Sequence, residues 1–565
     1  EQVFDKIKST LDDCAISKHE KDEQCWAHIQ RTESTITTIK EESKIFYDKK
    51  ITLDGGITLG PGKVTNKNGQ EYDPDFEIEQ VITALSQNLT LFGHLNKWFK
   101  DDYLIIPNKL SVSEDLCFKA GSTEHLAIAW KRLEDTSSRC MIFGGAAHQK
   151  HDDDVQVDAR SRGIKSSYHF EPNFSLFEVL DFISSHRVIE SNTQSFFSAV
   201  LESNIKSAIV NNLAEISSID DGKFISENEI CTLGEFSRLY SDDMFSDKTD
   251  CAGLTIKEWI RAYACLVYLA GGAKESTIDH CYSKEHLICL LADSGLSKEK
   301  AAIFISRTTF GYKSRDLYDC PLLKLEDGTY YLFHQSLKKS SIFFILNSRL
   351  SALEIVFDKK GFNFEKAIIS KLRKNNVEVK EFEFKRGKDQ YEYDCVFIMD
   401  SRVFVVECKN RSLPMWNPVR GARFKKLMDS TVDQVNRLID GLQRYPEVFL
   451  EHFEKDISQL EVIPVIMNCL PFSYMGEYRN AYITDSSSFG RFFQSKAITL
   501  REYQDGKANS SSDQDLYLQW KGNQPDSGDL LKHLKEPIQL KVYLNSLKID
   551  GKNENYYLQS ADIFS

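Results

Sequence analysis

The chain has few of the residues and patterns that mark several protein classes. It contains only 12 prolines and 28 glycines among 565 residues, which excludes collagen-like and Pro/Gly-rich low-complexity proteins. Its 13 cysteines show no Cys-x-x-Cys spacing, so we expect reduced thiols and no disulfide framework. No run approaches roughly 18 apolar residues, and the first residues are acidic where a signal peptide would be basic and then apolar. We therefore expect a cytoplasmic protein with no membrane association.

Acidic residues outnumber basic ones. The 84 Asp and Glu against 71 Lys and Arg give a formal net charge of −13. A nucleic acid would repel such a chain as a whole, so any contact with one must be local. The 41% hydrophobic and 12% aromatic content is that of a folded globular protein. At roughly 100–200 residues per domain, the length predicts three or four domains.

We expect an α+β multidomain fold whose N-terminal part is mostly helical. Residues 1–170 form a mixed domain with the strand-like runs LAIAW and CMIFGG. Residues 171–350 contain amphipathic segments such as SLFEVLDFISSH, IKEWIRAYACLVYLA and KEHLICLLADSG, typical of a helical scaffold or regulatory domain. The apolar faces of these helices suggest a protein partner or a homo-oligomer.

A third domain, residues 351–500, interleaves helices and strands in the manner of an α/β sandwich. Its expected elements are the helix FEKAIISKLRKN, the strands VEVKEFEF, YDCVFIM and VFVVECK, a long helix around 429–444, and the strands VIPVIMN and AYIT. Residues 501–565 form a tail that begins with the Ser-rich stretch QDGKANSSSDQD. Ser527 is the expected N-cap of the tail helix DLLKHLKEP.

The segment YDCVFIMDSRVFVVECKN carries the chemistry. The turn-forming pair Asp400-Ser401 separates two β-rich runs, so Met399 is expected to face Arg402 in an antiparallel hairpin. Both faces of the two strands are otherwise apolar, which places the hairpin at the centre of a sheet.

In that register Asp394 lies opposite Glu407, with β-carbons roughly 4.5–5.5 Å apart, and Lys409 shares their face. Two carboxylates at this separation suit Mg²⁺, which takes one or two carboxylates together with water and substrate phosphate. Lys409 would orient the attacking water and stabilise charge at phosphorus. Glu365, beside the apolar stripe of the preceding helix, could supply a further carboxylate.

A local basic run follows the hairpin. Between Arg402 and Lys426 the only acid is Glu407. Candidate contacts to a phosphate backbone are Arg411, Arg420, Arg423, Lys425 and Lys426. A charged surface with no ligand is the alternative.

The segments GFNFEKAI, YDCVFIMD and VVECK, with the later helix that carries Gln434, resemble the PD-(D/E)xK, or restriction-endonuclease-like, nuclease superfamily. Within it, residues 361–500 resemble the Mrr-like and nuclease-related (NERD) branches, where Asn417-Pro418 and Gln434 match a region after the E-x-K motif. One departure is Tyr393, which stands where the motif has proline.

The resemblance implies a restriction-endonuclease-like sandwich and cleavage of DNA that depends on Mg²⁺, with Mn²⁺ as a substitute. The residues that it implies for the site are Glu365, Asp394, Glu407, Lys409 and Gln434. The segment RDLYDCPLLKLEDGTYYL is similar to one that precedes such domains in bacterial proteins, which implies a role in defence against phage or other foreign DNA.

Several alternatives stay open. E-x-K alone is a common pattern, so the fold could serve non-catalytic binding of a nucleic acid or a partner, or the nuclease could act on RNA. The loop GGITLGPGK is not a phosphate-binding loop, because Ile57 and Val64 stand where that motif needs Gly and Ser or Thr.

The other clusters of His, Cys and Asp are interpreted as ordinary solvated or buried residues and not as metal sites. The loop with His148, His151 and Asp152–Asp154 is read as solvated. Two further sets lack the usual zinc spacing: Cys14, His19, Cys25 and His28, and His280, Cys281, His286 and Cys289.

Overall fold

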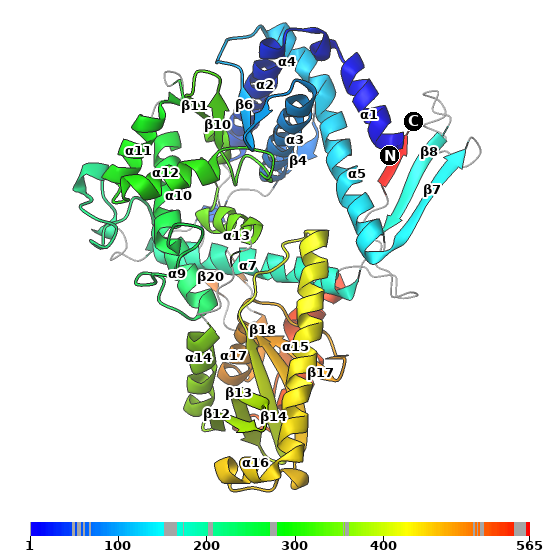
Figure 1. Cartoon of the computed structure of the whole chain (residues 1–565), viewed down its shortest axis with the longest axis vertical. Coiled ribbons are helices and arrows are strands. Elements are labelled where there is room, and N and C mark those ends of the chain that lie inside the picture. The colour runs from blue at the N-terminus through cyan, green and yellow to red at the C-terminus, as the bar shows by residue number, and fades with distance from the viewer. Residues whose placement is uncertain are drawn as a thin grey trace.

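The computed structural model describes residues 2–47, 51–52, 58–59, 63–66, 69–151, 166–172, 175–201, 207–271, 279–338, 340–353, 355, 361–500, 503–504, 507–508, 514–546 and 561–564. The molecule is elongated, with the N-terminal helices at one end and a large mixed sheet at the other (Figure 1). Among the described residues, no helix has both the length and the apolar character that crossing a membrane requires. Most of the Gly-rich loop, the side chains of His148 and His151, and Asp152–Asp154 lie outside the described part of the chain.

The N-terminal helices pack around one apolar core. They are α1 (Gln2–Asp13), α2 (Lys21–Tyr47), α3 (Pro74–Leu95), α4 (Glu114–Ala120) and α5 (Glu124–Phe143). This core contains Trp26 and Phe92, and also Phe310, Leu323 and Phe333 from much later in the chain.

The later residues join the N-terminal core through a shared sheet. Its strands are β5 (Phe99–Lys100), β6 (Tyr103–Ile106), β9 (Cys281–Tyr282), β10 (Leu322–Leu325) and β11 (Tyr330–Leu332), in the order β5-β6-β10-β11-β9. Strand β10 runs parallel to β6, with Lys324 opposite Ile105. The domain boundaries at 170, 350 and 500 stay a prediction.

The strands predicted at LAIAW and CMIFGG are wrong up to Phe143, because these residues form the helix α5. Leu126, Trp130 and Leu133 recur at helical spacing, and Trp130 lies edge-on to Phe4 of α1, with ring centroids 4.7 Å apart. A short apolar run does not separate helix from strand, and here packing against α1 and α3 selects the helix. The first strand in this region begins at Gly145.

The middle of the molecule is helical, as expected. Its helices are α7 (Leu176–Leu201), α9 (Glu227–Tyr240), α10 (Ile256–Gly271), α11 (Lys284–Asp293), α12 (Lys298–Thr308) and α13 (Ile342–Ala352). Their buried side chains, among them Trp259 and Phe236, belong to the same apolar cluster as Phe404 and Ile466 of the C-terminal sheet. The helical region is therefore packed directly onto that sheet.

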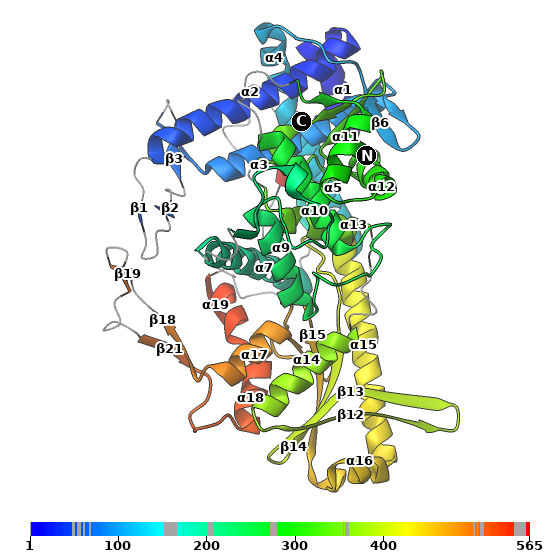
Figure 2. The ribbon, with the colours of Figure 1, turned by 90° about the vertical axis from the view of Figure 1, so that its left-hand side faces the viewer.

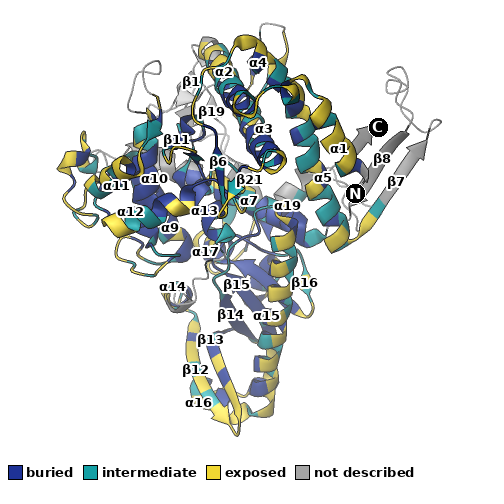
Figure 3. Ribbon diagram, turned by 45° about the horizontal axis from the view of Figure 1, so that its top comes forward, coloured by how far each residue is buried: buried dark blue, intermediate teal, exposed yellow. Residues whose placement is uncertain are grey.

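The C-terminal sheet has the order β12-β13-β14-β15-β17-β16. Its strands are β12 (Glu378–Arg386), β13 (Asp389–Met399), β14 (Arg402–Lys409), β15 (Glu461–Asn468), β16 (Glu477–Tyr478) and β17 (Ala481–Asp485). Strand β14 pairs antiparallel with β13 and parallel with β15. The predicted central position of the hairpin is thus confirmed, and β14 and β15 are almost wholly buried (Figure 3).

Helices flank this sheet. They are α14 (Gly361–Lys374), α15 (Pro418–Arg444), α16 (Pro446–Phe453) and α17 (Ser486–Gln494). Helix α14 packs on β12 to β14, and the long α15 runs beside β13 to β15, as Figures 1 and 2 show from two sides. The predicted long helix begins at Pro418, earlier than expected, because Asn417 caps it by accepting a 3.0 Å hydrogen bond from Arg420 N.

The tail contributes α18 (Ser527–Lys535) and α19 (Ile538–Ser546). The predicted N-cap at Ser527 is wrong, since the Asp526 side chain accepts the hydrogen bond from Asp529 N at 2.8 Å. Ser527 instead donates its backbone N–H to Asp400 Oδ2, 2.8 Å away. The tail helix is thereby fixed to the turn of the β13–β14 hairpin.

Short elements complete the chain. The remaining strands are β1 (Ile51–Thr52), β2 (Thr58–Leu59), β3 (Val64–Thr65), β4 (Glu71–Tyr72), β7 (Gly145–His151), β8 (Ser166–Pro172), β18 (Ala497–Leu500), β19 (Tyr503–Gln504), β20 (Lys507–Ala508), β21 (Gln514–Leu518) and β22 (Ala561–Phe564). Single 3-10 turns occur at η1 (Ala15–Lys18), η2 (Gly121–Thr123), η3 (Leu213–Glu215), η4 (His334–Ser336) and η6 (Ile457–Gln459).

Candidate active site

The β13–β14 hairpin has the predicted register. Met399 faces Arg402, and the ladder continues to the pair Cys395 and Val406. Asp400 makes the turn with a φ of 51°, a left-handed conformation that Asp tolerates better than most residues. The regular backbone pairing ends at Cys395 and Val406, one residue short of the pair Asp394 and Glu407. Beyond it, the Asp394 side chain, and not a backbone carbonyl, accepts the hydrogen bond from Cys408 N.

A β-bulge explains why the ladder ends there. On its other edge, β13 pairs with β12, and between Lys380 and Phe382 the register shifts by one residue. Asp394 and Cys395 therefore both oppose the single residue Glu381. A bulge bends its strand and re-aims the side chains at that point, and bulges are frequent beside active sites.

The Asp394 carboxylate lies where the bulge directs it. Its Oδ2 accepts a 2.8 Å hydrogen bond from Cys408 N, on the neighbouring strand. Burial, and next the negative charge of Glu407, raise the pKa of Asp394 to about 7, although the Cys408 N–H and Lys409 oppose the shift. An anionic Asp394 thus lacks sufficient compensating positive charge from the protein itself.

Glu407, Lys409 and Gln434 form a hydrogen-bonded triangle. Lys409 Nζ donates to Glu407 Oε1 at 2.6 Å and to Gln434 Oε1 at 3.3 Å, and Gln434 Nε2 donates to the same Glu407 oxygen at 2.7 Å. Glu407 is 2% exposed, and its second oxygen, Oε2, is buried with no hydrogen-bond partner. Burial raises the pKa of Glu407 even though Lys409 lowers it.

Glu365 completes an acidic cluster. It stands on α14 beside the buried Phe364 and Ile368, as its place next to the apolar stripe predicted. Burial raises its pKa to about 7, and Asp394, Glu392 and Glu381 raise it further in that order, against Lys409. The hairpin, the bulge and α14 therefore bring Glu365, Asp394 and Glu407 into electrostatic contact.

The donor set at this point fits a hard divalent cation. Among the described residues, no three His, Cys, Asp or Glu side chains converge as a ready-made metal-binding group. Mg²⁺ does not need one, because one or two carboxylates, water and substrate phosphate complete its octahedron. Such a cation would give Glu407 Oε2 a partner, and it would stabilise the ionised form of Asp394 and so lower its raised pKa.

The basic run is distributed over the start of α15 and the loop before it. Arg420 Nη1 donates to Ser351 Oγ at 3.0 Å, and Lys425 pairs with Asp429 at 3.2 Å. This end of α15 lies beside α5 and α7. Arg423 and Lys426 are exposed and Arg411 is half-buried. The structure does not gather the five cations around the carboxylates, and their role in binding stays a prediction.

The loop that follows Lys409 is held by the N-terminal part of the chain. Trp416 N donates to Asp181 Oδ2 at 2.7 Å, and Arg139 Nη2 donates to Trp416 O at 2.9 Å. At the ends of neighbouring strands, Arg187 of α7 makes a two-pronged ion pair with the buried Asp485, at 2.8 and 3.0 Å. Nothing in the local sequence marks these partners, which stand more than two hundred residues apart.

Sequence reasoning also did not identify Glu381 and Glu392 as members of the acidic cluster. From the alternation of apolar and polar residues, both are expected to point away from the core of the sheet. The bulge places Glu381 opposite Asp394, and both Glu381 and Glu392 act on the charge of Glu365. An excess of acids in VEVKEFEF, immediately before the hairpin, was the available signal.

Comparison with protein families identifies a nuclease-related domain at residues 360–468. The match extends through α14 and the hairpin to the end of β15, and so contains each residue of the acidic cluster and the triangle. Comparisons with curated proteins and with solved structures gave no match.

Proposed function

We propose that residues 361–500 are a Mg²⁺-dependent phosphodiesterase of the PD-(D/E)xK, restriction-endonuclease-like type that cleaves DNA internally. The observation that carries the proposal is the buried triangle of Glu407, Lys409 and Gln434 beside Asp394 and Glu365. A structural ion pair would leave no reason for two further acids, Asp394 and Glu365, to gather around it at the cost of raised pKa values.

Lys409 acts on the substrate through its remaining donor. An ammonium has three N–H donors, and Glu407 and Gln434 hold two of them. The third is free to bind a phosphate oxygen or to orient the attacking water. That water forms the new bond to phosphorus and gives one proton to solvent or to a carboxylate. The bond to the leaving oxygen breaks, and that oxygen takes up a proton from solvent.

The carboxylates hold the cation. Asp394 and Glu407, the latter through Oε2, would bind Mg²⁺, with Glu365 as an additional ligand. When bound, the cation favours deprotonation of water and neutralises charge that develops on the phosphate. Gln434 keeps Glu407 and Lys409 in the orientation that both tasks need.

The test is incubation of the purified full-length protein with plasmid, linear duplex, single-stranded DNA and RNA, each with Mg²⁺, Mn²⁺ or EDTA. Nicking or linearisation of the plasmid with Mg²⁺ or Mn²⁺, absent in EDTA and in Lys409→Ala, supports the proposal. Cleavage of RNA alone would replace DNA as the substrate. Binding with no cleavage under any condition would favour a non-catalytic nucleic-acid-binding protein.

The biological setting that we propose is defence against phage or other foreign DNA. It is supported by the likeness of residues 315–332 to segments that precede such nuclease domains in bacterial proteins. Expression of the wild type should reduce phage plaques and Lys409→Ala should not. Equal plaque numbers would remove defence from the proposal and leave the chemistry untouched.

A further inference from the structure

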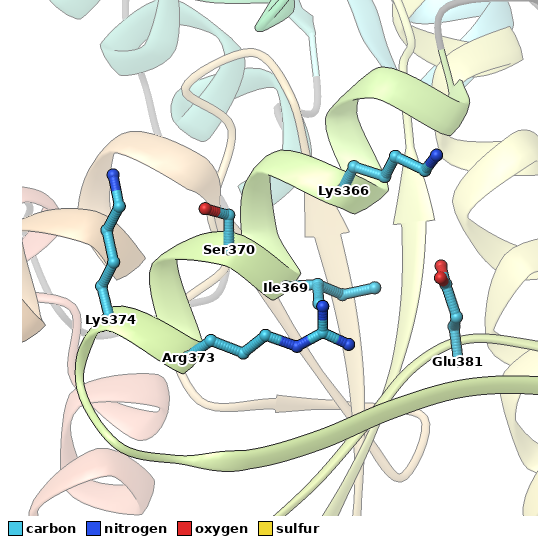
Figure 4. A pocket seen from close by; sticks show the side chains of 6 residues that line it. All are labelled: Lys366, Ile369, Ser370, Arg373, Lys374 and Glu381. Atoms are coloured by element: carbon cyan, nitrogen blue, oxygen red, sulfur yellow. The ribbon is translucent and has the colours of Figure 1, made fainter.

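A basic pocket opens on α14, next to the acidic cluster. It has a volume of about 610 Å³ and is lined by Lys366, Ile369, Ser370, Arg373, Lys374 and Glu381. In Figure 4, Lys366 and Arg373 extend towards the side where Glu381 stands, and Lys374 extends from the last turn of the helix away from it. The three cations and Ser370 are exposed, and Ile369 is buried beneath them.

Three of these side chains share one face of the helix. Lys366, Ser370 and Arg373 stand at positions i, i+4 and i+7, so they form a line along α14. At 1.5 Å per residue, this line is about 10 Å long. That length covers roughly three nucleotide steps at 3.4 Å of rise per strand.

The pocket and the acidic cluster are contiguous. Glu381 lines the pocket, and it is also the residue opposite Asp394 and Cys395 in the bulge. Burial raises the pKa of Cys395, with smaller contributions from Asp394, Glu381 and Glu365, and Arg373 is close enough to lower it. A strand that lies in the pocket is therefore brought next to the bulge that carries Asp394.

Such a strand needs cations at this point. The acidic cluster repels a phosphodiester, and the bound metal would offset only part of that charge. Arg373 and Lys374 make no ion pair with other described residues, so their charges are available to a ligand. By contrast, Arg420 and Lys425 of α15 already contact Ser351 and Asp429.

Cations in the last turn of a helix also have a purely structural role, because they interact favourably with the helix dipole. That role does not require a pocket, a third cation two turns earlier, or a position beside the acidic cluster. It predicts a change in stability alone, whereas a binding role predicts a change in affinity that depends on salt.

We propose that the α14 pocket, lined by Lys366, Ser370, Arg373 and Lys374, binds the phosphate backbone of the substrate strand next to the bond that is cut. The inference rests on the proposed function for the identity of the cut bond, but binding can be measured without cleavage. The strand runs along α14, over Glu365, to Asp394 and Lys409.

The experiment compares the double variant Arg373→Gln/Lys374→Gln with the wild type, both as full-length protein. The matched control is Lys284→Gln/Lys298→Gln, which removes two exposed charges from α11 and α12. Binding of a fluorescent oligonucleotide, single-stranded and duplex, is measured by anisotropy in EDTA at roughly 50 to 200 mM salt. Thermal unfolding of each variant shows whether the fold is kept.

We expect the α14 variant to bind about tenfold more weakly at low salt, with a slope of log K against log salt that is smaller by about 1–2. The single variant Arg373→Lys, which keeps the charge, should bind with most of the affinity of the wild type. In cleavage assays with Mg²⁺, the KM should rise and the kcat should change little.

Unchanged affinity and slope in a folded α14 variant, or an equal loss in the control, would overturn the inference. The outcome is separable from that of the proposed function. If the wild type binds through α14 but cleaves nothing, the binding site stands and the catalytic proposal fails. If the wild type cleaves and the α14 variant does so with the same KM, only the binding site fails.

Discussion

Gln434 and Lys409 donate hydrogen bonds to the same oxygen of Glu407, Oε1, at 2.7 and 2.6 Å. In turn, Gln434 Oε1 accepts a hydrogen bond from Lys409 Nζ at 3.3 Å. The side-chain amide of Gln434, on α15, thus contacts both the acid and the amine, and the other Glu407 oxygen, Oε2, is left without a hydrogen-bond partner. Gln434 is therefore a positioning residue, and its effect on a reaction must pass through Glu407 and Lys409.

We expect Gln434→Ala to lower kcat about tenfold and to leave the KM for DNA nearly unchanged, because one interaction that orients Lys409 in the transition state is lost. Gln443→Ala, on the exposed side of the same helix, is the control and should be silent. Steady-state cleavage of a plasmid measures both. A raised KM with an unchanged kcat would instead place Gln434 in substrate binding.

Asp394→Asn, Glu407→Gln and Lys409→Ala should each reduce cleavage by at least about a hundredfold, since each removes a charge that acts on the reacting phosphate or its metal. Glu365→Gln should have an equal or smaller effect. Asp440→Asn, an exposed acid on α15, controls for the loss of one negative charge. Wild-type rates in the three folded variants would remove these residues from the active site.

The acidic cluster should make the metal-free protein less stable as the pH rises. The pKa values of Asp394 and Glu365 are each raised to about 7, above unfolded values of about 4. Between about pH 4 and pH 7 such a carboxyl ionises in the unfolded chain but stays protonated in the folded protein. The free energy of unfolding therefore falls across this pH range.

We therefore expect Glu365→Gln to raise the Tm in EDTA by roughly 2–4 °C at pH 8 and by nothing at pH 4. The gain is modest because Glu365 is only half-buried and solvent screens its charge. Mg²⁺ should raise the wild-type Tm at pH 8 and raise that of Glu365→Gln or Asp394→Asn less. A Tm of the wild type that does not respond to Mg²⁺ or Mn²⁺ would contradict the assignment of a metal site.

Arg187→Ala should weaken the attachment of α7 to the C-terminal sheet. Burial alone would raise the pKa of Asp485, but Arg187 and the neighbouring hydroxyls lower it to about 2. Loss of the arginine leaves a buried carboxylate without its partner, which costs about 3–5 kcal/mol. Because the folded pKa is depressed, the destabilisation should be full above pH 4 and disappear as the pH falls towards 2.

Thermal unfolding of Arg187→Ala against Arg479→Ala provides the comparison, since Arg479 makes exposed ion pairs with Asp429 and Asp433 that are worth little. If the helical region restrains the nuclease-related domain, Arg187→Ala should also cleave DNA faster than the wild type. An unchanged rate in a destabilised Arg187→Ala would limit the helical region to a structural role.

The sequence predicted the hairpin well because its determinants are local. The Asp400-Ser401 pair sets the register, and alternation along both strands determines which side chains share a face. The strands beyond the hairpin were predicted for the same reason, since VIPVIMN and AYIT are apolar runs that a buried parallel sheet requires.

What the sequence did not reveal depends on contacts between distant segments. The bulge at Asp394 lies where β13 pairs with β12 on one edge and with β14 on the other, and there the Asp394 side chain accepts a hydrogen bond from Cys408 N. The position of Glu381, and hence the link from the site to the α14 pocket, follows from that bulge. Likewise LAIAW is apolar enough for either structure, and only its packing against α1 and α3 decides for helix.

The sheet that unites β5 and β6 with β10 and β11 has a consequence for synthesis of the chain. Strand β6 ends at Ile106, but its parallel partner β10 begins only at Leu322. During synthesis, the edge of β6 that pairs with β10 stays unpaired until more than two hundred further residues have been added. Every strand of that sheet has nonetheless been synthesised before Glu365, Asp394 or Glu407 is added to the chain. The order of translation itself therefore ensures that the acidic cluster never appears on a chain whose N-terminal sheet still lacks a strand.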